Sequence, residues 1–118
     1  MSSTPLFDQP VHQMAEASME AYRHISETLT DREIETFIRV ADYIDRTGYP
    51  DVTGGELSAW SGVPVTSIRP RLTGLVDKGW LHTGGLRASR CHGERRCHPV
   101  WPAVPKEAIE RVRRTTGR

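Results

Sequence analysis

This sequence lacks long apolar runs and is poor in cysteine. No stretch of its 118 residues approaches the roughly 18 consecutive apolar residues that a membrane-spanning helix needs. Its 2 cysteines are too few for a disulfide scaffold. The start of the chain, Met1 to Pro5, has no basic segment leading into an apolar one, so we expect no secretion signal. The length suits one folded domain, which we expect to be soluble and cytoplasmic and to make no membrane contact.

Recognisable catalytic motifs are missing as well. The sequence contains no convincing Ser/His/Asp arrangement, phosphate-binding glycine loop or paired His–carboxylate motif. Two glycine pairs, Gly54-Gly55 and Gly84-Gly85, fit helix-cap and turn chemistry instead. We therefore predict that the protein is not an enzyme and has no cofactor.

The charge, in contrast, is strongly divided along the chain. Residues 1–64 carry four Lys/Arg and eleven Asp/Glu, a net charge of −7, whereas residues 65–118 carry twelve Lys/Arg and four Asp/Glu, a net charge of +8. A basic half of this kind favours a polyanionic partner, most often nucleic acid. The alternative is a dipolar protein whose two halves neutralise each other.

The N-terminal part of the chain predicts a tail followed by two helices. Residues 1–10, with two prolines and small polar residues, are typical of a disordered tail. Residues 11–29 carry apolar side chains at helical spacing, which predicts an amphipathic helix that packs on the domain or forms a homodimer. Thr30 and Glu33 fit a capping box that opens a second helix, and Gly48 is its expected left-handed end.

Two further helices follow at short intervals. Thr53 and Glu56 repeat the capping box and open a short helix that Gly62 ends. A longer helix is predicted over about residues 66–78, with its apolar side chains within one 100° arc. Pro70, near the start of this helix, predicts a late start or a bend.

The remaining chain predicts a β-hairpin and a last helix. We expect Leu86–Cys91 to pair with Arg96–Trp101, and the prolines of the second arm limit it to an edge strand. Pro105 suits the first position of a basic C-terminal helix or tail over residues 105–118. We expect one core that contains Ile34, Phe37, Ile38, Leu57, Trp60, Ile68, Leu72, Leu75 and Trp101.

This order of elements predicts a mainly α fold with a small β-hairpin, a winged helix-turn-helix over residues 30–104. A helix of about 10–12 Å diameter fits the major groove, and a basic hairpin beside it reaches phosphates. The predicted recognition helix has short side chains opposite its apolar arc and an arginine on either flank. The expected DNA-binding residues are Thr66, Ser67, Arg69, Arg71 and Thr73 on the helix and Arg87, Arg90, Arg95 and Arg96 on the hairpin.

The segment Thr66-Ser67-Ile68-Arg69-Pro70-Arg71, followed by Leu75 and Gly79, resembles the winged helix-turn-helix proteins of tailed phages and related mobile elements. In that family a T-x-x-R-P-R core precedes L-x-x-x-G and a hairpin ending in an aromatic residue, as Val100-Trp101 does here. The resemblance implies a three-helix winged domain that binds DNA through Arg69 and Arg71. Two features depart from the family pattern: the Cys and His residues in the predicted hairpin, and the long first helix.

The hairpin tip gathers two cysteines and two histidines, Cys91, His92, Cys97 and His98. Adjacent residues of a strand point to opposite faces, and the usual Cys-x2-Cys spacing is absent, so we predict no metal site, with a zinc site from these four as the minor alternative. A three-residue loop would place Cys91 opposite Cys97, which leaves a cross-strand disulfide open. Two thiols are expected in a reducing cytoplasm.

Together these features predict a transcription regulator that binds double-stranded DNA in a phage or bacterial setting. A second hypothesis is a protein-interaction module whose acidic first half docks on a host or replication protein, because the fold does not fix the function. Leu6-Phe7 faintly resembles the end of a sliding-clamp-binding peptide, but the leading glutamine is missing. An inert tail is the simpler interpretation.

Overall fold

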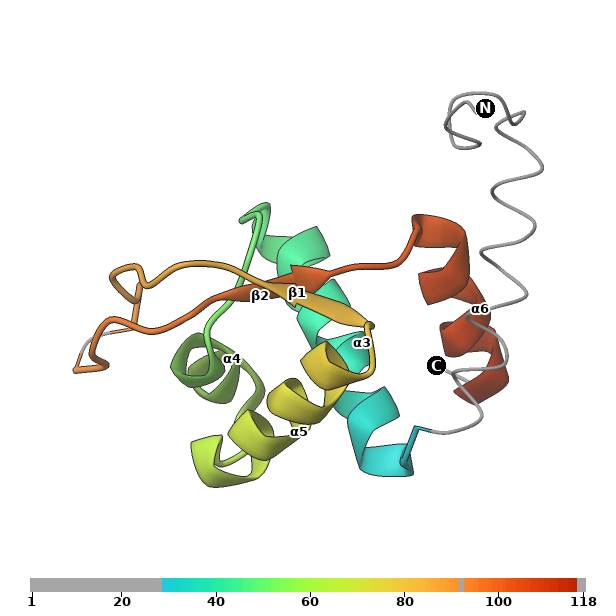
Figure 1. Ribbon diagram of the computed structural model, residues 1–118, viewed down its shortest axis with the longest axis horizontal. Helices are drawn as coiled ribbons and strands as arrows, with labels where there is room; N and C mark the ends of the chain where they lie inside the picture. The colour runs from blue at the N-terminus through green and yellow to red at the C-terminus, as the bar shows by residue number, and fades with distance from the viewer. Residues whose placement is uncertain (1–28, 92, 117–118) are drawn as a thin grey trace, which may run out of the picture.

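The computed structural model describes residues 29–91 and 93–116, and within them it is mainly helical with one small antiparallel hairpin (Figure 1). The elements are α3 (Asp31–Thr47), α4 (Gly54–Ser61), α5 (Val65–Asp77), β1 (Leu81–Thr83), β2 (Val100–Pro102) and α6 (Lys106–Thr116). The predicted mainly α class with a small hairpin is confirmed, and the arrangement is compatible with a winged helix. The predicted tail over residues 1–10 and the predicted helix over 11–29, except its last residue, lie outside the described residues.

Both predicted capping boxes are present. The Thr30 hydroxyl accepts a hydrogen bond from the Glu33 amide at 3.1 Å, and the Thr30 amide donates to the Glu33 carboxylate at 2.9 Å. Thr53 and Glu56 form the same reciprocal pair at the start of α4. Gly48 and Gly62 end the two helices in the left-handed region, each with φ 80°. These local signals therefore fix where α3 and α4 begin and end.

Helix α5 corresponds to the predicted recognition helix and begins at Val65. Pro70 lies inside the helix, so the expected late start does not occur. Gly79, with φ 83°, then reverses the chain and brings Trp80 onto the core. This reversal sends the chain directly into β1.

The hairpin is real, but its predicted arms are wrong. The strands pair at the base of the hairpin, Leu81 with Pro102 and Thr83 with Val100. Further out along the hairpin, an isolated bridge joins Arg87 to Cys97. We call residues 84–99 the wing, all of which is described except His92. Backbone pairing is sparse there, and side-chain contacts with α4 and α5 also hold the wing in place.

The second arm is also not an edge strand at its centre. The Val100 amide donates to the Val52 carbonyl at 2.8 Å, and the Val52 amide donates back at 3.0 Å. Val100 therefore lies between β1 and the segment that precedes α4. Proline is tolerated nearby because Pro102 occupies the last position of β2.

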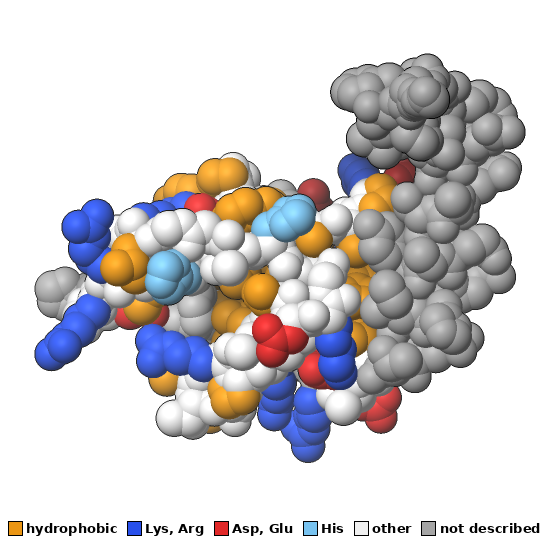
Figure 2. Space-filling view, viewed as in Figure 1, with side chains coloured by type: hydrophobic (Ala, Val, Ile, Leu, Met, Phe, Trp, Pro, Cys, Tyr) orange, Lys and Arg blue, Asp and Glu red, His pale blue; other side chains and the backbone are white. Residues whose placement is uncertain are grey.

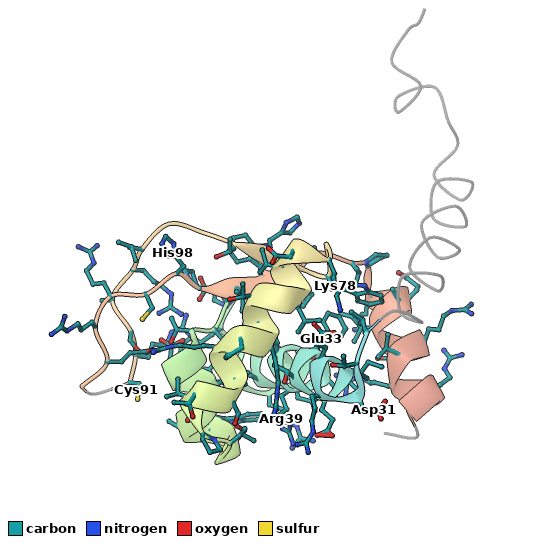
Figure 3. The ribbon with its side chains drawn as sticks, turned by 60° about the horizontal axis from the view of Figure 1, so that its bottom comes forward. Asp31, Glu33, Arg39, Lys78, Cys91 and His98 are labelled. Atoms are coloured by element: carbon teal, nitrogen blue, oxygen red, sulfur yellow. The ribbon has the colours of Figure 1, made fainter. Side chains whose placement is uncertain are left out.

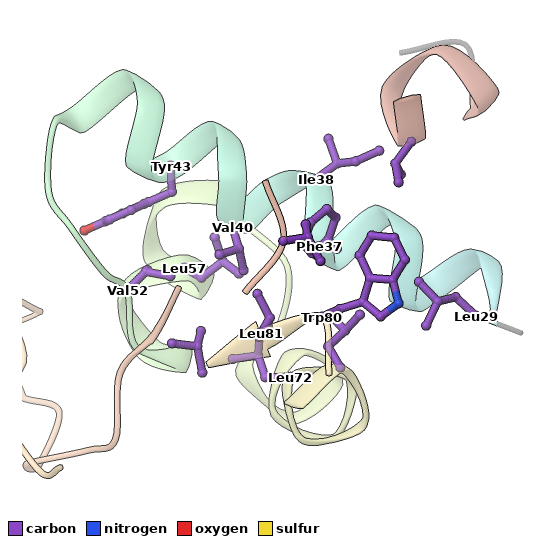
Figure 4. Close-up of a cluster of buried hydrophobic side chains, with 14 of the residues drawn as sticks. Leu29, Phe37, Ile38, Val40, Tyr43, Val52, Leu57, Leu72, Trp80 and Leu81 are labelled. Atoms are coloured by element: carbon purple, nitrogen blue, oxygen red, sulfur yellow. The ribbon is translucent and has the colours of Figure 1, made fainter. Parts of the chain in front are cut away.

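One apolar core joins α3, α4, α5, the hairpin and α6 (Figure 4). Six predicted core residues are buried in it: Phe37, Ile38, Leu57, Ile68, Leu72 and Leu75. Ile34 packs against the core and is partly buried, and Trp101 is half-buried.

The predicted burial of Trp60 is wrong, because its side chain is 42% exposed. Trp60 instead meets the Tyr43 ring edge-on, with ring centroids 5.6 Å apart. The central tryptophan is Trp80, which is 1% exposed and meets Phe37 edge-on at 5.1 Å. The turn at Gly79 places Trp80 there, and helical periodicity carries no signal of it.

Helix α6 packs against α3 on the side away from the wing (Figure 1). Ala108 and Val112 are buried, and Arg113 pairs with Asp42 of α3 at 2.5 Å. Pro105 directly precedes the helix rather than opening it, and its carbonyl accepts hydrogen bonds from the amides of Ala108 and Ile109. Over residues 29–91 and 93–116 no helix has both the length and the apolar character needed to cross a membrane.

Candidate nucleic-acid interface

Helix α5 turns its apolar side inward and a surface of short side chains outward. Ile68, Leu72 and Leu75 are buried in the core. The predicted contact residues Thr66, Arg69 and Thr73 are exposed, whereas Ser67 and Arg71 are half-buried. Thr66, Arg69 and Thr73 therefore lie on the outward side of α5, whereas Gly74 of the predicted outer face lies against Glu33 of α3.

The wing lies beside α5 and forms a groove with it. The groove has a volume of about 580 Å³, and its lining includes Arg69 and Thr73 from α5 and Leu86, Arg96 and His98 from the wing. Leu86 is 57% exposed in this position. Helix α5 and the wing thus contribute to one continuous surface.

Arg95 and Arg96 are exposed on the wing. Figure 2 shows Lys and Arg side chains gathered at the wing end of the molecule. Within the part of the chain that the structure describes, neither forms an ion pair with a carboxylate, and the same holds for Arg71 on α5. These three guanidinium groups are available to an external anion.

Arg87 and Arg90 have a different environment. The Arg87 guanidinium pairs with Asp51 at 2.9 Å and with Glu56 at 2.8 Å. Arg90 pairs with the same two carboxylates, at 2.8 Å and 3.2 Å, and its guanidinium carbon lies 3.8 Å from the centre of the Tyr49 ring. Both arginines therefore attach the wing to the chain before and within α4 instead of pointing to solvent.

Glu56 is the centre of this attachment, with a side chain only 2% exposed. Burial alone would raise the pKa of Glu56, but hydrogen bonds from the Arg87 side chain and from the Arg90 and Thr53 amides outweigh it and lower the pKa to about 2. The hydrogen bonds that Arg87 donates to Glu56 and Asp51 raise the pKa of Arg87. The carboxylate and both guanidinium groups are therefore charged at neutral pH.

A second buried carboxylate, Glu94, attaches the wing tip to α4 and α5. Glu94 accepts hydrogen bonds from the Thr53 hydroxyl at 2.8 Å, the Gly55 amide at 2.9 Å and the Ser89 hydroxyl. It also pairs with Arg69 at 3.2 Å. Burial opposes ionisation, but these donors together lower the pKa of Glu94.

The cysteines and histidines of the wing do not gather at one point. The alternative of a Cys91–Cys97 disulfide is not found: Cys97 is bridged to Arg87, and both cysteines are free thiols. Cys97 lies 3.4 Å from Glu94, while His98 Nδ1 lies 2.7 Å from the Gly84 carbonyl. Figure 3 shows Cys91 and His98 on separate parts of the wing.

Burial and the neighbouring Glu94 carboxylate raise the pKa of the Cys97 thiol, which disfavours the thiolate that a metal would bind. Among the described residues no group of three or more His, Cys, Asp or Glu side chains is arranged to hold a metal ion. His92, the fourth member of the predicted alternative zinc set, lies outside the described residues.

No protein-family model matches the sequence, and no curated protein matches it. The resemblance of Thr66–Arg71 to phage winged helix-turn-helix proteins therefore stays a prediction. The phage or bacterial setting stays a prediction as well.

Sequence reasoning missed the carboxylates that organise this surface: Asp51, Glu56 and Glu94. Two signals were available. Glu94 is the one acidic residue between Gly79 and Pro105, in an otherwise basic segment. The Gly54-Gly55 pair opens α4 at the point where Arg69 and Glu94 approach the helix. An isolated acid in a basic hairpin and two glycines at a helix start together indicate a close tertiary contact.

Proposed function

We propose that the protein binds double-stranded DNA as a winged helix-turn-helix and regulates transcription. The observation that carries this proposal is the groove between α5 and the wing, which Arg69 and Thr73 of α5 and Arg96 of the wing line together. A helix of about 10–12 Å diameter with a low outer face fits the major groove, and α4 would brace it across the backbone.

The residues divide into three roles in this proposal. Thr66, Ser67 and Thr73 make short-range contacts, and Arg69 and Arg71 reach base edges or phosphates from the flanks of α5. Arg95 and Arg96 contact phosphates from the wing. We give Arg87 and Arg90 a positioning role, because Asp51 and Glu56 already occupy their guanidinium groups.

The proposal is tested by selecting bound duplexes from a random-sequence DNA pool with the full chain. Affinity for a selected site and for an unrelated duplex is then measured by fluorescence anisotropy. We expect an enriched site, and Arg69→Ala should weaken binding to it by about 1–3 kcal/mol if Arg69 reads a base. An equal loss on the unrelated duplex would mark Arg69 as a phosphate contact.

Arg32→Ala is the matched control, since Arg32 is exposed at the start of α3, remote from the wing (Figure 1). It should leave both affinities unchanged. Absence of any enriched site, with the protein folded by circular dichroism, would reject DNA recognition.

A protein-interaction role is the second candidate, favoured by exposed aromatic side chains. Tyr49 and Trp60 are 46% and 42% exposed, and both contact the buried Tyr43 ring. Aromatic residues of this kind are enriched at the centres of protein interfaces. Capture of one defined partner from a nuclease-treated extract, lost in Trp60→Ala and retained in Arg69→Ala, would favour this role over DNA binding.

A further inference from the structure

Arg69 is held in one orientation by two contacts from different parts of the chain. Its guanidinium pairs with Glu94 of the wing at 3.2 Å. Its aliphatic stem lies so close to Gly54 that a Cβ atom there would come within 3.0 Å of Arg69 Cγ. The side chain nevertheless remains 56% exposed. Arg69 is thus fixed along one side and open on the other.

Glu94 is itself firmly held, with a side chain only 8% exposed. Its carboxylate accepts hydrogen bonds from the Thr53 hydroxyl, the Gly55 amide and the Ser89 hydroxyl in addition to Arg69. Moving the carboxylate would leave these partly buried donors without their acceptor, which is costly. Glu94 is therefore a rigid support for Arg69 rather than a mobile competitor for it.

The glycine pair of α4 makes this support possible. A Cβ atom at Gly55 would come within 3.0 Å of the Glu94 carboxylate, closer than real Cβ contacts allow. Gly54 and Gly55 have no side chain, so the Arg69 stem and the Glu94 carboxylate both lie against the first turn of the helix. The Gly55 amide in that turn also donates a hydrogen bond to the Glu94 carboxylate.

The charge of this pair bears on what Arg69 contacts. A carboxylate at 3.2 Å offsets much of the guanidinium charge, and phosphate attraction depends on that charge. Recognition of a guanine edge depends instead on two correctly oriented N–H donors, because guanine O6 and N7 are neutral acceptors. Arg69 pairs with Glu94 through Nη2, and its side chain stays 56% exposed. The arrangement therefore suits a base contact better than a phosphate contact.

We infer that Arg69 recognises a guanine in the major groove and that Glu94, a positioning residue on the wing, fixes the orientation that makes this contact specific. This inference rests on the proposed DNA-binding function. It assigns the wing a part in sequence specificity through Arg69, in addition to phosphate contacts through Arg95 and Arg96.

The experiment repeats the selection from random DNA with wild type, Arg69→Ala and Glu94→Gln, followed by anisotropy on the selected site, its single-base-pair variants and an unrelated duplex. Both variants should lose preference at the same G·C pair. In Glu94→Gln the ratio of specific to unrelated affinity should fall roughly 5- to 30-fold, within the range of one bidentate contact. The double variant should lose no more than Arg69→Ala alone, because the two residues act as a unit.

Asp77→Asn is the matched control. Asp77 is exposed at the end of α5, so the substitution removes the same charge near the interface without touching Arg69. It should raise affinity for both duplexes alike and leave the specificity ratio unchanged. Gly55→Ala is the second variant, since it displaces Glu94 without changing charge and should lose preference at the same base pair. Gly55→Ala replaces Glu94→Gln in the experiment if circular dichroism shows that Glu94→Gln does not fold.

The inference is overturned if Glu94→Gln, or Gly55→Ala in its place, leaves the ratio unchanged, if the two residues affect different base pairs, or if their losses multiply in the double variant. A selected site without a guanine that depends on Arg69 also overturns it. Failure of the wild type to enrich any site is a separate result, because it rejects the proposed function itself.

Discussion

Glu56 shows how one side chain can serve two structures. Its carboxylate completes the capping box of α4 through the Thr53 amide at 2.9 Å, and it also receives Arg87 and Arg90 from the wing. A buried carboxylate is stable only when its hydrogen bonds are satisfied, and here both the helix start and the wing supply donors. The local cap and the long-range attachment therefore depend on each other.

Glu56→Gln should lower the free energy of unfolding by about 3 kcal/mol, because it removes the charge that compensates two partly buried guanidinium groups. Urea unfolding followed by circular dichroism measures the effect. Asp45→Asn, which changes an exposed carboxylate of α3, should change stability by less than about 0.5 kcal/mol. Equal effects of the two substitutions would show that the network contributes no more than a surface charge.

Acid should weaken the fold through the same carboxylate. The pKa of Glu56 is about 2 in the folded protein against an ordinary value of 4.5, so the unfolded chain binds the proton more readily. Its contribution to stability is present above about pH 4.5 and is lost as the pH falls toward about 2. Glu33 and Glu94, whose pKa values are also lowered, add losses of the same sign. Urea midpoints measured from about pH 6 to about pH 2 should therefore fall, and less steeply in Glu56→Gln. Parallel curves for the two proteins would contradict this assignment.

A carboxylate also joins the start of α3 to the end of α5. Glu33 caps α3 and also pairs with Lys78, directly after α5, at 2.7 Å (Figure 3). Gly74 of α5 allows this approach, since a Cβ atom there would lie 2.5 Å from the second Glu33 carboxylate oxygen. The start of one helix is thereby fixed against the end of the other, and this sets the angle at which α5 is presented.

Gly74→Ala should give no stability gain in the wild-type chain. In an open helix the substitution stabilises by about 1 kcal/mol, but here it displaces the Glu33 carboxylate. In a Glu33→Ala background, where the obstacle is absent, we expect the gain of about 1 kcal/mol. Urea unfolding of the four proteins measures this cycle, and an equal gain in both backgrounds would refute the contact.

Over the protein as a whole, the divided charge of the sequence is partly neutralised by folding. Arg69, Arg87 and Arg90 come from the basic half, and Arg87 and Arg90 pair with Asp51 and Glu56 of the acidic half. Arg69 pairs within the basic half, with Glu94. The net charge of +8 over residues 65–118 therefore overstates the charge that faces a ligand. The exposed positive charge of the wing is concentrated instead on Arg95 and Arg96.

Replacing Arg95 and Arg96 together by Ala should lower the slope of log affinity against log salt by roughly one to two units, because each phosphate contact contributes about 0.9. Anisotropy on an unrelated duplex over a salt series measures the slope. Arg32→Ala serves as the control and should leave it unchanged. An unaltered slope in the double variant would remove the wing from the phosphate-binding surface.

The helices could be predicted closely because their signals are local. A capping box joins residues three apart, and Gly48 and Gly62 end their helices through their own backbone freedom. The exposed face of α5 followed from the apolar periodicity of the same segment. In each case the information lies within a few neighbouring residues.

The contacts of the wing, and the burial of Trp80 instead of Trp60, were decided only by the tertiary structure. Glu94 contacts residues 25 to 41 positions away, and no local pattern shows which arginines will meet a buried carboxylate and which will stay in solvent. Arg87 and Arg95 are both arginines of the wing, yet Arg87 is paired with the buried Glu56 and Arg95 is exposed. Sequence periodicity shows which side of a helix or strand is apolar. The partner of a charged side chain, in contrast, is decided only when distant segments pack together, because burial sets the free-energy cost of leaving that charge unpaired.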